Sequence, residues 1–130
     1  MGNNNKKYDE WIYQATAEMS ALLGIKTPPK VRLFGVDADA RREMKEHEKH
    51  YRVDNNACDD RLLGVAFPKQ NEIIIKQSHS PFPAIRKPGT RHTIAYELIH
   101  LKHPRLKHGE EFDRRTEALV ERWKKWKKEE

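Results

Sequence analysis

Apolar residues recur every three or four positions between residues 8 and 23, which is the spacing of an amphipathic helix. The repeating positions are Tyr8, Trp11, Ile12, Ala15, Met19, Leu22 and Leu23. Gly24 is a suitable stop for this helix, and residues 1–7 are expected to form a disordered tail. Residues 30–36, which follow two prolines, alternate between polar and apolar side chains and predict a half-buried strand.

The middle of the chain changes from polar to apolar. Residues 37–56 are almost wholly polar, and we expect a short exposed helix over 40–50 followed by a loop at 54–56. Two apolar runs then flank the turn sequence Pro68-Lys69-Gln70-Asn71, which predicts a hairpin with strands at 62–67 and 72–76. We expect residues 72–75 to be the edge strand, along which an extended peptide can pair.

The C-terminal part predicts two helices. Prolines between residues 78 and 89 indicate a loop, and Thr90 can cap a helix that runs until His103-Pro104. A last helix is predicted after Gly109, with an apolar face formed by Phe112, Thr116, Leu119, Val120, Trp123 and Trp126. The chain has 130 residues and no internal repeat, so the order of elements predicts one α+β domain.

Composition excludes some classes of function. The chain is 36% hydrophobic and 35% charged, and its single cysteine, Cys58, cannot form an internal disulfide. No apolar run approaches the length of a membrane span, and the N-terminal residues lack the apolar stretch of a signal peptide. We therefore expect a cytoplasmic protein without a membrane partner. The formal charge of +6 allows a nucleic-acid partner, but cations in the last turns of a helix, which complement its dipole, are the favoured explanation.

The candidate chemistry lies in the segment Tyr96-Glu97-Leu98-Ile99-His100. In the metalloprotease motif H-E-x-x-H, two histidines four residues apart on one helix bind zinc, and the glutamate activates a water molecule. Glu97 and His100 hold the second and fifth positions of this motif, and Tyr96 stands where the first histidine would be. An E-x-x-H pattern alone is weak evidence, because Tyr96 and His100 can also form an ordinary hydrogen-bonding pair.

The region from about residue 62 to residue 123 resembles the small HExxH zincins, namely the minigluzincins and the SprT-like and YgjP-like families. The resemblance is carried by Tyr96-Glu97-Leu98-Ile99-His100-Leu101-Lys102-His103-Pro104, then His108-Gly109 and Phe112. It implies a minimal zincin-like domain, in which a small mixed sheet packs with an N-terminal helix, an active-site helix and a C-terminal helix. It also implies Zn²⁺ as the cofactor, a peptide or unfolded protein as the substrate, and hydrolysis of peptide bonds.

The same resemblance implies roles for individual residues. Glu97 is the expected general base, and His100 is an expected zinc ligand. The SprT-like and YgjP-like families nominate His108 as the third ligand, whereas the minigluzincins nominate Glu117. We favour His108, because Glu117 is rotated by about 120° from the apolar face of its helix. Tyr96 departs from the family pattern; since tyrosine binds zinc only as phenolate, we expect weak zinc binding and impaired catalysis.

Two other functions stay open. A pseudoenzyme that keeps the fold but has lost catalysis would bind polypeptide and would need no stoichiometric zinc. A DNA-associated protein, which the SprT-like resemblance allows, would bind DNA in a salt-dependent manner. The remaining histidines, His47, His50, His79, His92 and His103, are expected in loops or on solvated helix faces.

Overall fold

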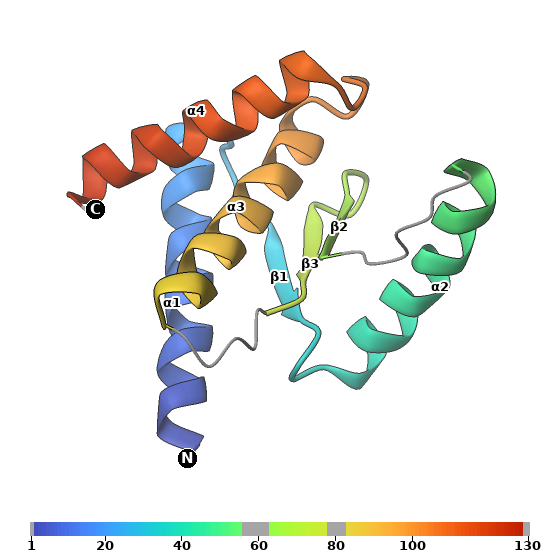
Figure 1. The fold of residues 1–130 in the computed structure, drawn as a ribbon, viewed down its shortest axis with the longest axis horizontal. Helices are drawn as coiled ribbons and strands as arrows, with labels where there is room; N and C mark the ends of the chain where they lie inside the picture. Colours follow the sequence, from blue (N-terminus) through green and yellow to red (C-terminus); the bar gives the residue numbers. More distant parts are fainter. Residues whose placement is uncertain (1, 56–62, 78–82, 129–130) are drawn as a thin grey trace.

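The computed structural model describes residues 2–55, 63–77 and 83–128. These residues form four helices and a three-stranded mixed sheet (Figure 1). In chain order the elements are α1 (Gly2–Leu22), β1 (Lys30–Leu33), α2 (Ala38–Asn55), β2 (Gly64–Phe67), β3 (Glu72–Ile75), α3 (Pro83–Lys102) and α4 (Glu110–Lys127). The predicted α+β class is confirmed. Cys58, His79, Asn56 of the predicted loop and the loop residues 78–82 lie outside the described residues.

β3 is the central strand of the sheet. It pairs in parallel with β1 and antiparallel with β2, so the strand order is β1-β3-β2 and the predicted hairpin is confirmed. The predicted edge position of residues 72–75 is wrong. Ile73, Ile74 and Ile75 are all fully buried, and a strand that is buried on both faces lies inside a sheet. The edge strand of the hairpin is β2. β1 is shorter than the predicted strand at 30–36, because the chain turns there to enter α2.

The two faces of the sheet carry hydrophobic clusters of different size. On one face α1, α3 and α4 pack with Ile73 and Ile75 into the main core, which includes the fully buried Trp123, Phe112, Ile12, Met19 and Leu98. On the other face α2 contributes a small cluster, formed by Ala40, Met44, Val65 and Ile74. Figure 1 shows this division, with α2 standing on one side of the strands and the other three helices on the opposite side.

α1 ends as predicted and begins earlier than predicted. Gly24 has a φ of 78°, and the amides of Gly24 and Ile25 donate to carbonyl oxygens of the last turn at 3.0 Å in a Schellman motif. At the other end the helix starts at Gly2, so the tail predicted for residues 1–7 is wrong for residues 2–7. This segment contains no proline, and a helix that packing has already nucleated extends at little cost.

α2 is longer than the predicted helix over residues 40–50 and is not wholly exposed. Asp37 caps it, because its Oδ1 accepts hydrogen bonds from two first-turn amides at 2.9 and 3.2 Å. Ala40 and Met44 are fully buried. The helix continues to Asn55, through part of the predicted loop, because no glycine or proline interrupts it.

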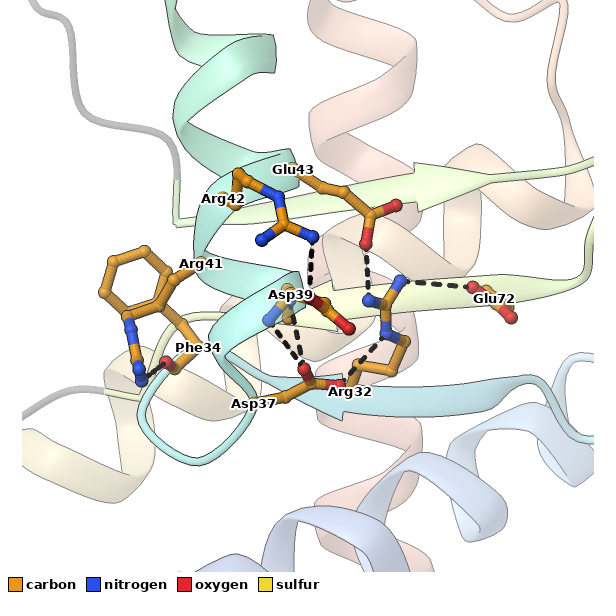
Figure 2. A network of polar contacts seen from close by, with 9 residues as sticks. Arg32, Phe34, Asp37, Asp39, Arg41, Arg42, Glu43 and Glu72 are labelled. Carbon is orange, nitrogen blue, oxygen red and sulfur yellow. Dashed lines mark hydrogen bonds and ion pairs between the residues drawn. The ribbon is translucent and has the colours of Figure 1, made fainter.

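Arg32 connects β1, α2 and β3 through carboxylates (Figure 2). Its guanidinium group lies 3.3 Å from Asp37 and 3.6 Å from Glu72, and it also pairs with Glu43 of α2. Polar contacts therefore hold α2 on the sheet together with the small apolar cluster.

α3 begins at Pro83, before the predicted cap at Thr90. Proline suits the first helical position, because the amides there have no partner within the helix. Pro88 lies inside the helix, so the prediction of a loop up to residue 89 is wrong for residues 83–89. Thr90 does not cap the helix; its hydroxyl bonds with the hydroxyl of Tyr8 in α1.

α4 begins after Gly109, as predicted. Its fully or nearly fully buried residues are Phe112, Thr116, Leu119 and Trp123. Trp126, predicted on the same face, is 57% exposed. The C-terminal half of α4 lies against α1, where the Glu18 carboxylate accepts hydrogen bonds from the Trp123 indole and the Lys127 ammonium, both at 3.0 Å. The basic end of α4 is thus fastened to α1.

Candidate functional site

Two turns of α3 carry three of the predicted site residues. Ile94 and Leu98 are fully buried in the main core and fix the orientation of the helix. Tyr96 and His100, four residues apart, lie on the same side of it, with ring centroids 5.0 Å apart. Both are partly exposed, whereas the Glu97 side chain between them in sequence is buried.

His108 joins these rings from the segment that precedes α4. Tyr96, His100, His108 and Phe112 form what we call the ring cluster. Phe112 is the buried member against which the other three pack. Its ring centroid lies 4.6 Å from that of Tyr96, 4.5 Å from that of His100 and 5.2 Å from that of His108. His108 itself is exposed, so the cluster is buried on one side and open to solvent on the other.

The polar atoms of the ring cluster meet at hydrogen-bonding distance. His100 Nε2 and His108 Nε2 are 3.0 Å apart. The Tyr96 hydroxyl lies 3.2 Å from His108 Nδ1 and 3.3 Å from His108 Nε2. Three side chains, two from α3 and one from the loop that follows it, therefore direct polar atoms toward one point.

The two imidazoles have the spacing of ligands to a single ion. Zn–N bonds of about 2.0–2.1 Å at tetrahedral angles separate two donors by about 3.3 Å, close to the distance between His100 and His108. The next donor is the Tyr96 phenol, which must lose its proton to bind a metal. Within the described ranges, no three His, Cys, Asp or Glu side chains gather into a group that could hold a metal ion. The two imidazole nitrogens thus lie about as far apart as two ligands of one ion, and a phenol stands where a third ligand would be.

Glu117 lies away from this cluster. It is exposed on α4, and in the described part of the chain it forms no metal-ligating group with His100 and His108. Of the two nominees for the third ligand, the structure brings His108 to His100 and leaves Glu117 on the surface.

Burial shifts the pKa values of Glu97 and His100 in opposite directions. It raises the pKa of the Glu97 carboxyl to about 8. Burial, and secondarily the charge of His108, lowers the pKa of His100 to about 4. At neutral pH the metal-free protein therefore has a protonated Glu97 and a neutral His100. The lone pair of the neutral imidazole can bind a metal or accept a hydrogen bond.

Other histidines near the site have ordinary partners. His92 is exposed and stacks on Tyr96, with ring centroids 6.4 Å apart. His103 lies 3.2 Å from the Arg115 guanidinium group, and burial together with that charge lowers the pKa of His103. His47 packs edge-on against Phe67. These placements agree with the prediction that they lie in loops or on helix faces.

Gly64 is the residue beside the candidate base that the sequence pattern did not single out. It is the first residue of β2, is paired with Ile75 and is buried. A Cβ atom added to it would lie 2.7 Å from Glu97 Cγ and 2.9 Å from Glu97 Oε2. The available signal was a glycine within a strand pattern, which often marks a close approach.

Comparison of the chain with protein-family models, with curated proteins and with solved structures gives no match. Across the described residues, no helix combines the length and the apolar character needed to cross a membrane. The site must therefore be interpreted from its own geometry and from the motif in α3.

Proposed function

We propose that this chain is a zincin-type peptidase domain whose zinc site is impaired by Tyr96. The observation that carries the proposal is the 3.0 Å separation of His100 Nε2 and His108 Nε2, which come from different parts of the chain. Glu97 follows the position of the missing ligand and precedes His100 by three residues, which is the order of the H-E-x-x-H motif.

The residues divide into metal holders and a base. His100 and His108 would hold a zinc ion, which when bound supplies a Lewis acid that polarises the scissile carbonyl group. Glu97 accepts the proton of the attacking water and returns a proton to the leaving amine. A general base works best with a pKa near the operating pH. Burial raises the Glu97 pKa to about 8 in the metal-free protein, and the positive charge of a bound zinc ion would lower it again and release the carboxylate for this role.

The substrate is an extended peptide that pairs with β2. In the described part of the sheet, one side of β2 pairs with β3 and no strand covers the other. Edge strands bind peptides through main-chain hydrogen bonds, and β2 begins at Gly64 in contact with Glu97. β2 thus replaces residues 72–75 as the expected binding strand.

A second candidate is a polypeptide-binding domain that does not cleave. The hydrogen bond between the Tyr96 hydroxyl and His108 favours it, because this bond engages the imidazole that a metal would need. Such a domain would keep the edge strand and dispense with the ion.

Zinc content tests the proposed impairment, and cleavage separates the two candidates. Loss of a supporting partner typically lowers metal affinity about 10–100-fold, and loss of a direct ligand at least that much. We expect substoichiometric zinc in the unaltered chain and near-stoichiometric zinc after Tyr96→His, measured by elemental analysis of proteins purified side by side. Equal, full occupancy of both would contradict the proposed impairment. The Tyr96→His protein should also cleave an unfolded test protein, and binding zinc without cleavage would favour the polypeptide-binding candidate.

Three further variants of the Tyr96→His protein test the assignments. Glu97→Ala should keep zinc and lose cleavage, because it removes the base and no ligand. His108→Ala should lose zinc, whereas the control Glu117→Ala, on the exposed side of α4, should retain it. The opposite result for the last two would mean that Glu117 is the third ligand and that the ring cluster is only structural.

A further inference from the structure

The backbone conformation of Gly64 does not require a glycine. Its φ lies outside the left-handed region, unlike those of Gly24 and Gly109. Any residue can therefore adopt its backbone conformation. A side chain is excluded because there is no room for its Cβ atom. An added Cβ would lie 2.7 Å from Cγ and 2.9 Å from Oε2 of Glu97, distances that real Cβ atoms essentially never show, and a tight 3.1 Å from Cδ.

Glu97 cannot yield to such a Cβ by a small movement. The closest atom is Cγ, near the root of the side chain, so its position is set by χ1 and not by the flexible end. The helix cannot shift either, because Ile94, Leu98 and Ile99 are buried in the main core. β2 packs against α3, and Gly64 is the residue of β2 that lies against the Glu97 side chain.

We propose that Gly64 is a positioning residue for Glu97. The backbone of Gly64, which carries no side chain, lies directly against the Glu97 side chain and limits its conformation. β2, the strand proposed to bind substrate, therefore also fixes the position of the Glu97 carboxyl group. The catalytic consequence rests on the proposed function, whereas the contact between Gly64 and Glu97 does not.

The contact is tested by stability and needs no activity. We expect Gly64→Ala to lower the Tm by at least about 4 °C, as overpacking of a filled core does. Glu97→Ala removes all three atoms that the new methyl group would meet. In that background the same Gly64→Ala change should therefore lower the Tm by less than about 1 °C. If Gly64→Ala alone does not fold, recovery of folding in the double variant supports the proposal. An equal loss in both backgrounds, or failure of both to fold, overturns it.

The positioning role is tested in the Tyr96→His protein. Gly64→Ala should lower kcat at least about 10-fold, with zinc content and KM little changed, because a displaced base no longer reaches the attacking water. Gly89→Ala is the matched control, since nothing lies within 4 Å of a Cβ there, and its kcat should be unchanged. Unchanged kcat in Gly64→Ala would overturn the positioning role. If the Tyr96→His protein cleaves nothing, the peptidase proposal fails, and the Tm comparison still decides whether Gly64 limits the conformation of Glu97.

Discussion

The two faces of the sheet are held by different forces. On the face toward α1, α3 and α4, large side chains such as Trp123 and Phe112 are fully buried in one continuous cluster. On the face toward α2, a small apolar cluster is supplemented by the carboxylates around Arg32. Glu97 and the ring cluster belong to the first face. Dense packing tolerates little displacement, so the candidate chemistry is positioned by the part of the molecule least able to move.

The largest effect should follow from a truncation in the main core. Trp123→Ala should lower the free energy of unfolding by about 3–5 kcal/mol, because it leaves a cavity and removes the indole that donates to Glu18. Trp126→Ala, on the same helix but exposed, should change it by less than about 0.5 kcal/mol. Urea unfolding of both variants measures the difference. Similar losses at the two positions would mean that α4 does not anchor this face.

The buried carboxyl should make the main core sensitive to pH. The pKa of Glu97 rises from 4.5 to about 8 on folding, so the stability tied to its proton is present below about pH 4.5 and is lost as the pH rises to about 8. We expect Glu97→Gln to remove this decline, stabilising the metal-free protein at pH 8 by a few kcal/mol, to order of magnitude.

His100 gives the opposite slope and serves as the internal reference. Its pKa falls from 6.5 to about 4 on folding, so its contribution is lost as the pH falls from 6.5 to 4. Thermal unfolding of Glu97→Gln should be measured over a range of pH values, with a chelator present to remove metal. Its stability should rise with pH up to about pH 6.5 and then stay level. A decline above pH 6.5 equal to that of the unaltered protein would show that Glu97 is not its source.

Several elements could be read from the sequence because one local rule decided each. Gly24 ended α1, Gly109 preceded α4, and the turn at 68–71 joined two strands as predicted. The central position of β3 was predicted wrongly, although three consecutive isoleucines are typical of a strand covered on both faces and could have indicated it.

Other features depend on contacts between distant segments. The packing of Gly64 on Glu97 joins residues that only the tertiary fold brings together, and no local pattern encodes it. The start of α3 at Pro83 was missed because Pro88 lies inside the helix, where a proline costs about 3 kcal/mol and favours a break. The spacing of His100 and His108 likewise depends on the loop between α3 and α4.

The polar face should respond to a charge change. Arg32→Met should lower the free energy of unfolding by about 1–2 kcal/mol, because it leaves three neighbouring carboxylates without their shared cation. Hydrogen exchange should accelerate in α2 more than in α3. Arg114→Met is the control, since Arg114 is an exposed partner of Glu111, and its effect should stay below about 0.5 kcal/mol. Uniform acceleration of exchange would mean that Arg32 stabilises the whole domain.

The smallest effect should come from Gln77, which follows β3 and links α1 to the loop after β1. Buried Gln77 accepts a hydrogen bond from the Gly35 amide at 2.9 Å and donates one to Asp9 of α1 at 3.1 Å. Gln77→Ala should lower the free energy of unfolding by about 1 kcal/mol. Exposed Gln70→Ala is the matched control and should have no measurable effect in urea unfolding. A loss of unfolding free energy above about 3 kcal/mol would make Gln77 and its partners a third stabilising region.

The parallel pairing of β1 with β3 has a consequence for folding and for the growth of the chain. Val31 pairs with Ile73, so the intervening segment, with α2 in it, must be looped out before the sheet is complete. Distant pairings of this kind slow folding more than they limit stability. The entropy of closing such a loop grows only with the logarithm of its length, by about 0.6 kcal/mol for each doubling. The part of this segment that precedes β2 is accordingly the place where the domain can lengthen without losing the packed face that carries Glu97.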